Sequence, residues 1–277
     1  MKDLIDLNII EFISKYDYQL KITKVELAYN DIKLNKVSIL EINYKVFDKK
    51  HRIYTGKTNG LMGRPRFEMM KNIIEKDNVC LCLLRSLVNT STFSSIFISK
   101  SLVDKNLYGF QTSLFPLYLY SQTNGQNDLY DQDLRIPNLN PEILNQIAKG
   151  LGLTFTPEKE TEGEVCFAKS QEVRPEFKQT FAPIDLLDYI YAVLHSPSYR
   201  EKYKEFLKID FPRVPYPTDV EFFWKLVALG GELRQLHLLE SKTVENYITQ
   251  YPIDGNNVVD KPTFVISEEQ RVMNFTF

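Results

Sequence analysis

The chain has 277 residues, of which 43% are hydrophobic and 25% are charged, and its formal net charge is −2. These values are ordinary for a globular protein with one large domain or two domains of common size. No run of about eighteen apolar residues occurs, so we expect no membrane-spanning helix. The N-terminal segment lacks the pattern of a signal peptide, and we expect a cytoplasmic protein.

The three cysteines predict no metal site. Cys80 and Cys82 lie in the apolar run NVCLCLL, and Cys166 is remote from both. A C-x-C spacing without a second ligand pair does not provide the four ligands that structural zinc needs. We expect buried, reduced thiols, which agree with a cytoplasmic location.

The first half of the chain is predicted to be rich in strands. Residues 1–36 form a helical lead-in, in which Leu4, Leu7 and Ile10 share one helical stripe, although 17–36 is ambiguous between strand and helix. Strands follow at 37–47 and 52–55, with a turn at 48–50, and a helix begins after Arg64-Pro65-Arg66. Further strands are predicted at 79–86, 94–100 and 113–121, and Pro116 places the last of them at a sheet edge or a bulge.

The second half is predicted to be helical. A polar loop at 122–134 precedes a helix that starts at Asn140-Pro141 and stops near Gly150 and Gly152. Residues 154–180 form a linker or loop. Helices then follow at 183–194, after Ser196-Pro197, and from a capping box at 218–221 to about residue 239. The segments TFVIS and RVMNF predict a terminal hairpin.

The stretch from Tyr44 to Lys76 is strongly basic within an acidic chain. Its three acidic residues are outnumbered by nine Lys or Arg: Lys45, Lys49, Lys50, Arg52, Lys57, Arg64, Arg66, Lys71 and Lys76. Such a cluster can neutralise phosphates and leave Arg and aromatic side chains for base edges. The alternative is a solvated turn region without a function.

Other chemical signals are weak. Gly56-Lys57-Thr58 resembles the end of a phosphate loop, but His51 stands where the first glycine is required. The three histidines are far apart, and His195 and His237 are expected to be structural. Asp185 and Asp188 are one helical turn apart and are expected to be a solvated surface pair. We find no catalytic motif and no cofactor fingerprint.

Several segments resemble one family in the same order. They are INYKVFDKKHRIYTGKTNGLMGRPRFEMM, LFPLYLY, IPNLNPEI, and the long block FAPIDLLDYIYAVLHSPSYREKYKEFLKIDFPRVPYP with the following helix that ends in ELRQLHLLES. Over about residues 40–277, the chain resembles the C-terminal specificity region of type ISP restriction–modification enzymes, which are adenine-specific DNA methyltransferases. Lys45-Val46 stands where the family often has Arg-Pro.

The resemblance implies a non-catalytic part of a larger enzyme. In such enzymes an upstream domain binds S-adenosylmethionine and methylates a flipped adenine with an Asn-Pro-Pro-aromatic motif. That motif is absent from these residues. S-adenosylmethionine is therefore expected only in the missing methylase domain. The expected partners are double-stranded DNA and that methylase domain, with a helicase or nuclease domain where one accompanies it.

The sequence thus predicts a mixed α+β fold for sequence-specific DNA recognition. We expect a target-recognition domain at 37–153, a linker or loop at 154–180, a helical support region at 181–250 and a hairpin at 251–277. The DNA-binding candidates are Arg52, Tyr54, Lys57, Arg64, Arg66 and Arg85. Arg64 and Arg66 could each bind a guanine edge through two hydrogen bonds.

Three alternatives stay open. Arg66 could instead cap its helix or pair with Glu68 or Glu75. The chain could be a protein-interaction module that docks a methylase or motor domain through its aromatic helices. A nuclease or methylase site that exists only after folding is a third possibility.

Overall fold

The computed structural model describes residue 30 and residues 38–55, 65–86, 93–120, 135–158, 179–247, 263–266 and 271–274. The predictions for the lead-in, the loop at 122–134, Cys166 and most of the linker lie outside these ranges, apart from residue 30 of the lead-in. The chain divides into two compact units, Met1–Glu240 and Ser241–Phe277. No helix among the described residues is long and apolar enough to span a bilayer.

A central antiparallel sheet organises the first unit. Strand β3 (Cys80–Leu84) lies between β4 (Ile96–Ser99) and β6 (Thr112–Pro116), and every residue of β3 is buried. The predicted strands at 79–86 and 94–100 are confirmed. The prediction that Pro116 places its strand at a sheet edge is also confirmed, because β6 is an edge strand and Pro116 is its last residue. After it, β7 (Tyr118–Tyr120) pairs with β8 (Arg135–Pro137).

A second sheet covers one face of the first. Strand β1 (Ser38–Lys45) pairs with β2 (Asp48–Tyr54) in an antiparallel hairpin and with β5 (Leu102–Val103) in parallel. The predicted turn at 48–50 is wrong, because Asp48 pairs with Lys45 and the turn falls on Val46 and Phe47. Phe47 takes a left-handed φ of 63° there.

The turn residue Phe47 packs against two aromatic rings from distant parts of the sequence. Its ring centroid lies 5.4 Å from that of Phe97 and 6.0 Å from that of His237. The hairpin is therefore in contact with both β4 and the end of the last long helix.

From residue 38 onward, the described part of the first unit contains the helices α4 (Phe67–Met70), α5 (Pro141–Leu151), α6 (Pro183–His195), α7 (Pro197–Lys202), α8 (Lys204–Leu207) and α9 (Val220–His237). As predicted, the Asn140 side chain caps α5, and Gly152 ends it in a left-handed conformation. The predicted cap of α9 is one residue off, because the Asp219 side chain, not Thr218, accepts from Phe222 N at 2.7 Å. Strands β9 (Thr154–Phe155) and β10 (Thr180–Phe181) pair in parallel at the two ends of the predicted linker.

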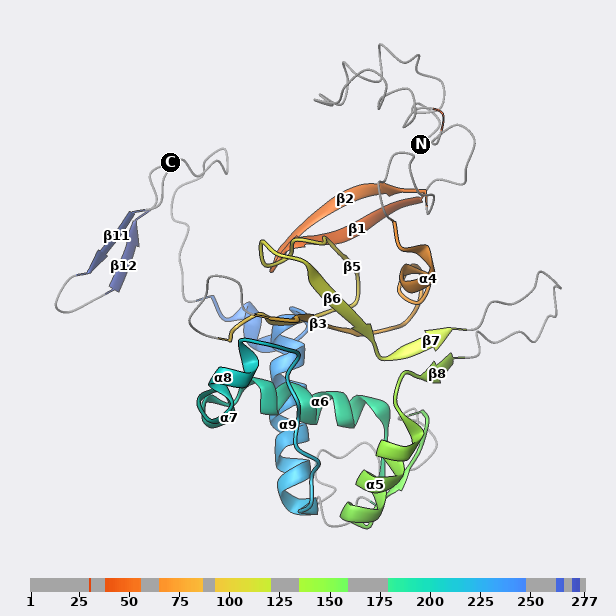
Figure 1. The fold of residues 1–277 in the computed structure, drawn as a ribbon. Coiled ribbons are helices and arrows are strands. Elements are labelled where there is room, and N and C mark those ends of the chain that lie inside the picture. The colour runs from red at the N-terminus through yellow and green to blue at the C-terminus, as the bar shows by residue number, and fades with distance from the viewer. Residues whose placement is uncertain are drawn as a thin grey trace. The chain divides into compact units, whose positions relative to one another are not determined.

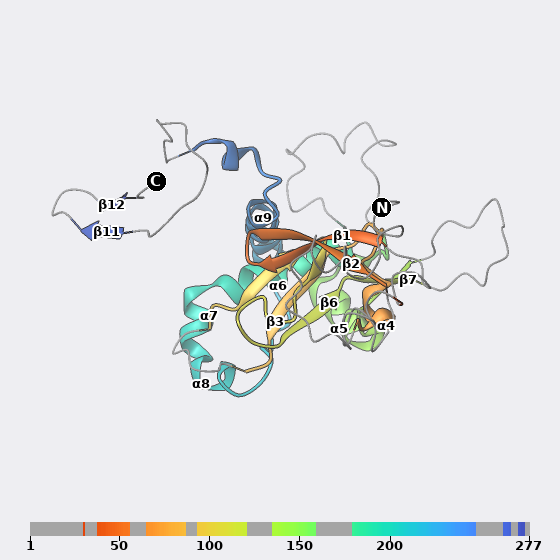
Figure 2. The same cartoon turned by 90° about the horizontal axis from the view of Figure 1, so that it is seen from above.

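Alternate side chains of β3 pack against two different layers. Leu81 and Leu83 belong to the main core with α5, α6 and α9, whereas Cys80 and Cys82 face the residues of the β1–β2–β5 sheet. Figure 1 shows α5, α6 and α9 on one side of the β3 sheet and the β1–β2 hairpin on the other, and Figure 2 shows the hairpin lying over β3 and β6. Both cysteines are free and buried, as predicted, and burial raises the pKa of Cys80 to about 12.

The crossing of α6 and α9 contains a buried ion pair. Asp188 on α6 accepts from Arg234 Nε at 2.6 Å and from Arg234 Nη2 at 3.0 Å. Asp185 is also buried, and its side chain accepts from Ala182 N at the start of α6. The expectation that these two acids form a solvated surface pair is therefore wrong. Both carboxylates face inward because each has a specific donor.

The ends of α6 and α9 also meet in a histidine cluster. The Tyr191 hydroxyl is hydrogen-bonded to His237 Nδ1, and His195 Nδ1 donates to the Tyr191 carbonyl at 2.8 Å. The ring centroids of the two histidines are 5.5 Å apart. Both side chains thus join the two helices, in agreement with the structural role expected of them.

The second unit comprises Ser241–Phe277. It contains a short 3-10 helix, η2 (Lys242–Glu245), and the antiparallel strands β11 (Thr263–Ile266) and β12 (Arg271–Asn274). The predicted terminal hairpin is confirmed.

Two glycines allow a matched test of helix packing. A Cβ at Gly230 in α9 would lie 1.9 Å from the carbonyl oxygen of Asp188, whereas one at Gly150 in α5 would lie 3.7 Å from that of Pro217. We predict that Gly230→Ala lowers the free energy of unfolding by about 2 kcal/mol or more, because α6 and α9 must separate. Gly150→Ala should be neutral or stabilising by up to about 1 kcal/mol. Urea denaturation of both variants checks this, and equal effects would contradict the close crossing.

The histidine cluster predicts a pH dependence of stability. Burial lowers the pKa of His195 to about 4 from its ordinary value of 6.5. Between these values the unfolded chain binds more protons than the folded chain, so stability is lost as the pH falls from about 6.5 towards 4. We predict that His195→Gln loses less melting temperature between pH 7 and pH 5 than the wild type. Calorimetry measures both melting temperatures. An equal loss in the variant and the wild type would show that His195 does not cause the pH dependence.

Candidate nucleic-acid interface

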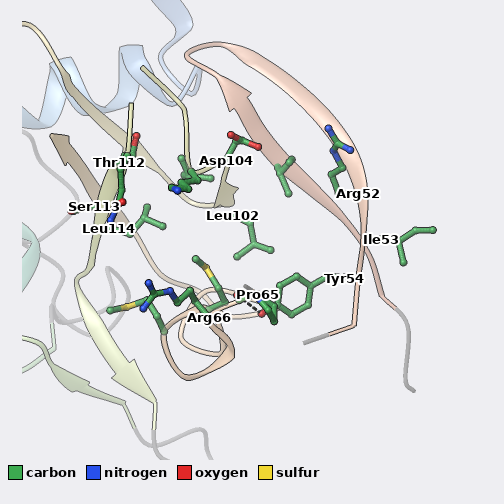
Figure 3. A pocket seen from close by; sticks show the side chains of 16 residues that line it. Arg52, Ile53, Tyr54, Pro65, Arg66, Leu102, Asp104, Thr112, Ser113 and Leu114 are labelled. Atoms are coloured by element: carbon green, nitrogen blue, oxygen red, sulfur yellow. Dashed lines mark hydrogen bonds between the residues drawn. The ribbon is translucent and has the colours of Figure 1, made fainter. Parts of the chain in front are cut away.

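A cavity of about 710 Å³ opens beside the β1–β2 hairpin. It is formed by strands β1 and β2, the start of α4, and the segment from β5 to β6. Figure 3 shows Arg52 and Arg66 on opposite sides of the cavity, with Leu102 between them in this view. Three of the six predicted DNA-binding residues, Arg52, Tyr54 and Arg66, thus line one cavity, although 13 residues separate the two arginines in the sequence.

The register of β2 directs Arg52 toward the cavity. Arg52 pairs with Leu40 of β1 and lies two residues before Tyr54, so both side chains project from the same face of the strand. Ile53 between them points to the other side in Figure 3. The Arg52 side chain is exposed, and no ion pair of Arg52 occurs among the described residues.

Tyr54 holds the segment that carries Arg66. Only 6% of Tyr54 is exposed, and its hydroxyl donates to the Pro65 carbonyl at 3.0 Å. Burial raises the pKa of Tyr54 to about 12, so the hydroxyl keeps its proton at neutral pH. The predicted DNA-binding candidate Tyr54 therefore has its polar atom engaged with the backbone next to Arg66.

Arg66 has a strained backbone and an exposed side chain. Its φ of 53° and ψ of 45° place it in the left-handed region, which is rare for a residue with a Cβ. Its carbonyl accepts from Met69 N and Met70 N, which starts α4. Its side chain makes no cap, and Glu68 pairs with Lys71 instead. The alternative that Arg66 pairs within its own helix thus finds no support among the described residues.

The opposite wall of the cavity comes from a segment that sequence reasoning missed. Asp104, Lys105, Gln111, Thr112 and Ser113 all line it. The Thr112 amide donates to the Lys105 carbonyl at 2.8 Å, which brings the two ends of this segment together. The only available signal was the polar triplet at 111–113 ahead of an apolar strand. The same triplet pattern is common in ordinary loops, so it could not have identified the wall by itself.

Most other cations of the described basic stretch have local partners. Lys49 pairs with Glu41 at 2.8 Å, Lys50 lies 4.0 Å from the centre of the Tyr44 ring, and Lys45 donates to the Asn106 carbonyl. Arg52 and Arg66 are therefore the more available cations, and Lys105 joins them from the opposite wall. Among the described residues of the cavity lining, Asp104 is the one acidic residue.

One further DNA-binding candidate is described, and it lies away from this cavity. Arg85 forms an ion pair with Asp210 at 3.1 Å and does not line the cavity. Its side chain is nevertheless 73% exposed. Lys57 and Arg64 lie at 56–64, outside the described residues. No group of three potential metal ligands occurs in the described part of the chain.

Comparison with known families decides where the chain belongs. The model of the Type ISP C-terminal specificity domain matches residues 11–274. The chain belongs to this family. The match covers nearly the whole sequence, so it includes both sheets of the first unit, its helices and the terminal hairpin.

Two solved structures share the fold of this specificity domain. One is described as the ATP-dependent Type ISP restriction-modification enzyme LlaBIII bound to DNA, with 19% identity, a TM-score of 0.54, and coverage of 98% of this chain and 16% of that chain. The other is a DrdV–DNA complex, with 21% identity, a TM-score of 0.51, and coverage of 85% and 19%. The specificity domain thus spans less than a fifth of each relative. Among curated proteins no match was found.

The left-handed conformation of Arg66 gives a stability prediction for this specificity domain. Glycine adopts this conformation without a Cβ penalty, whereas alanine does not. We predict that Arg66→Gly is more stable than Arg66→Ala by about 0.5–1 kcal/mol, after allowance for the greater entropy of glycine in the unfolded chain. Guanidinium denaturation of both variants measures the difference. A more stable alanine variant would show that the backbone at Arg66 is not left-handed.

Proposed function

We propose that this specificity domain recognises a sequence in double-stranded DNA for a restriction–modification methyltransferase. The observation that carries the proposal is the pair Arg52 and Arg66, two exposed guanidinium groups at one cavity with no carboxylate partner among the described residues. The two relatives of the same fold are each described as bound to DNA, which supports the same ligand here.

In this proposal the cations have two tasks. Contacts to phosphates place the domain on the duplex, and contacts to base edges supply the sequence preference. An arginine can donate two parallel hydrogen bonds to O6 and N7 of guanine, which is worth about 1–3 kcal/mol of discrimination. Arg52 and Arg66 would share these tasks with Lys57 and Arg64 of the neighbouring loop.

The chemistry would take place elsewhere in a larger enzyme. We propose that a separate methylase domain binds S-adenosylmethionine and that this chain determines which adenine reaches it. The chain covers 16% and 19% of the two relatives, which agrees with one part of a multidomain polypeptide or complex. Such an enzyme would act in the cytoplasm, where DNA is accessible.

A second candidate function is docking of a partner domain. Phe222 and Leu229 on α9 are each 59% exposed and lie seven residues apart, on the same side of the helix. An apolar face of this kind could contact a methylase or motor domain. It is compatible with DNA recognition, and it would become the main function if the chain did not bind DNA.

Removal of both arginines tests the proposal. We predict that Arg52→Ala with Arg66→Ala weakens binding to mixed-sequence duplex DNA at least about tenfold, and lowers the slope of log affinity against log salt by about 2. Fluorescence anisotropy at salt concentrations from about 50 to 200 mM measures both.

A matched control is Lys208→Ala with Lys225→Ala, which removes the same charge from the helical region, where both lysines pair with nearby glutamates. Circular dichroism checks the fold of each variant. An equal loss of DNA affinity in the two double variants would show that the effect depends only on the net charge of the chain. No binding of DNA by the wild type at any salt concentration would contradict the proposal and favour the docking function. S-adenosylmethionine binding by this chain would show that a catalytic site is present.

A further inference from the structure

We propose that the cavity between Arg52 and Arg66 binds a single unstacked nucleotide of the DNA. This inference rests on the proposed function, because the nucleotide would come from a duplex bound at this face. The proposed function requires only contacts with the outside of the DNA duplex. The inference adds a binding site that has an apolar floor, a cationic rim and a hydrogen-bonding wall.

The shape of the site argues for a ligand that enters it. Base edges in an intact duplex lie inside the grooves, so a protein reaches them with a projecting helix, strand or loop. A recess cannot enter a groove. At about 710 Å³ this cavity falls in the range of about 300–1,000 Å³ that is typical of sites for small molecules. A nucleotide that has left the base stack is the part of DNA that can fill such a space.

The floor of the cavity is apolar and suits the flat face of a base. Ile42 and Leu102 are buried beneath it, and Leu114, Met69 and Met70 surround them. These side chains come from β1, β5, β6 and α4, so the floor exists only where both sheets and the helix meet. A base placed on it would exchange water for apolar contacts, and this contact does not depend on base identity.

The rim of the cavity is cationic. Arg52, Arg66 and Lys105 line it, and the first two lie on opposite sides in Figure 3. The phosphates on either side of an unstacked nucleotide are separated by its sugar, so two cations across an opening can contact both. The left-handed backbone of Arg66 is a strained conformation of the kind that is often found at binding sites.

One wall of the cavity can form hydrogen bonds with a base edge. Gln111 is exposed and has no partner among the described residues, and Thr112 and Ser113 are half-buried beside it. The Thr112 hydroxyl donates to the Phe110 carbonyl at 3.3 Å, which leaves its oxygen free to accept from a base. Asp104 would repel a phosphate but can accept from an exocyclic amino group. The wall and the cationic rim therefore favour a base directed toward 104–113 and phosphates near the arginines.

Duplexes with one unpaired nucleotide test the proposal. A bulged nucleotide is already unpaired, so the energy of extruding a base from the stack is not required. We expect the wild-type chain to bind a duplex with a single-base bulge at least about tenfold more tightly than the fully paired duplex of the same sequence. A bulge that lacks only its base has similar flexibility but cannot occupy the floor. It should bind at least about fivefold more weakly than the bulge with a base.

A cavity-filling variant locates the effect. Ser113→Trp should abolish the difference between the two bulges, whereas the matched Ser113→Ala should retain the difference. Equal binding of the two bulges by the wild type overturns the proposal, with or without a folded Ser113→Trp variant. A folded Ser113→Trp that still distinguishes them also overturns it. Loss of salt-sensitive binding to every duplex would instead show that the proposed function itself is wrong.

Discussion

The close crossing of α6 and α9 is the constraint on which the rest of the first unit depends. Gly230 lies so near the backbone of Asp188 that no side chain fits between the helices. The same aspartate is buried and held by two hydrogen bonds from Arg234. A buried carboxylate without such donors would be strongly unfavourable, so the pair fixes both the distance and the rotation of the helices. The helices then offer one continuous apolar surface to β3.

Strand β3 connects the crossed helices to the candidate site, because its two faces pack against different layers. Its leucines pack on the helices, while Cys80 and Cys82 pack on the second sheet and on the floor residues near the cavity. Phe47 adds a second connection, because the tip of the hairpin touches His237 at the end of α9. The hairpin that carries Arg52 is therefore supported at both its middle and its tip. A rigid support of this kind keeps the cations in place without a bound ligand.

The sequence predicted the regular elements well because their signals are local. The β3 strand, the Asn140 cap and the terminal hairpin each follow from a short pattern. The errors concern long-range partners. Asp188 looked like a surface acid because Arg234 is 46 residues away, and the hairpin turn was misplaced because Phe47 finds its partners on β4 and α9. At the site, Arg52 and Arg66 were identified from charge. The wall at 104–113 was not, because only the fold brings neutral polar residues opposite the arginines.

Membership of the specificity-domain family and the position of Arg52 and Arg66, which have no ion pair among the described residues, support our central proposal that DNA binds at the cavity face of the first unit. Hydrogen–deuterium exchange of the chain with and without duplex DNA tests this claim most directly. The account predicts slower exchange for the amides of β2, of 65–70 and of 104–113 when DNA is present, with little change along α9. Protection confined to α9, with unchanged exchange around the cavity, would contradict it.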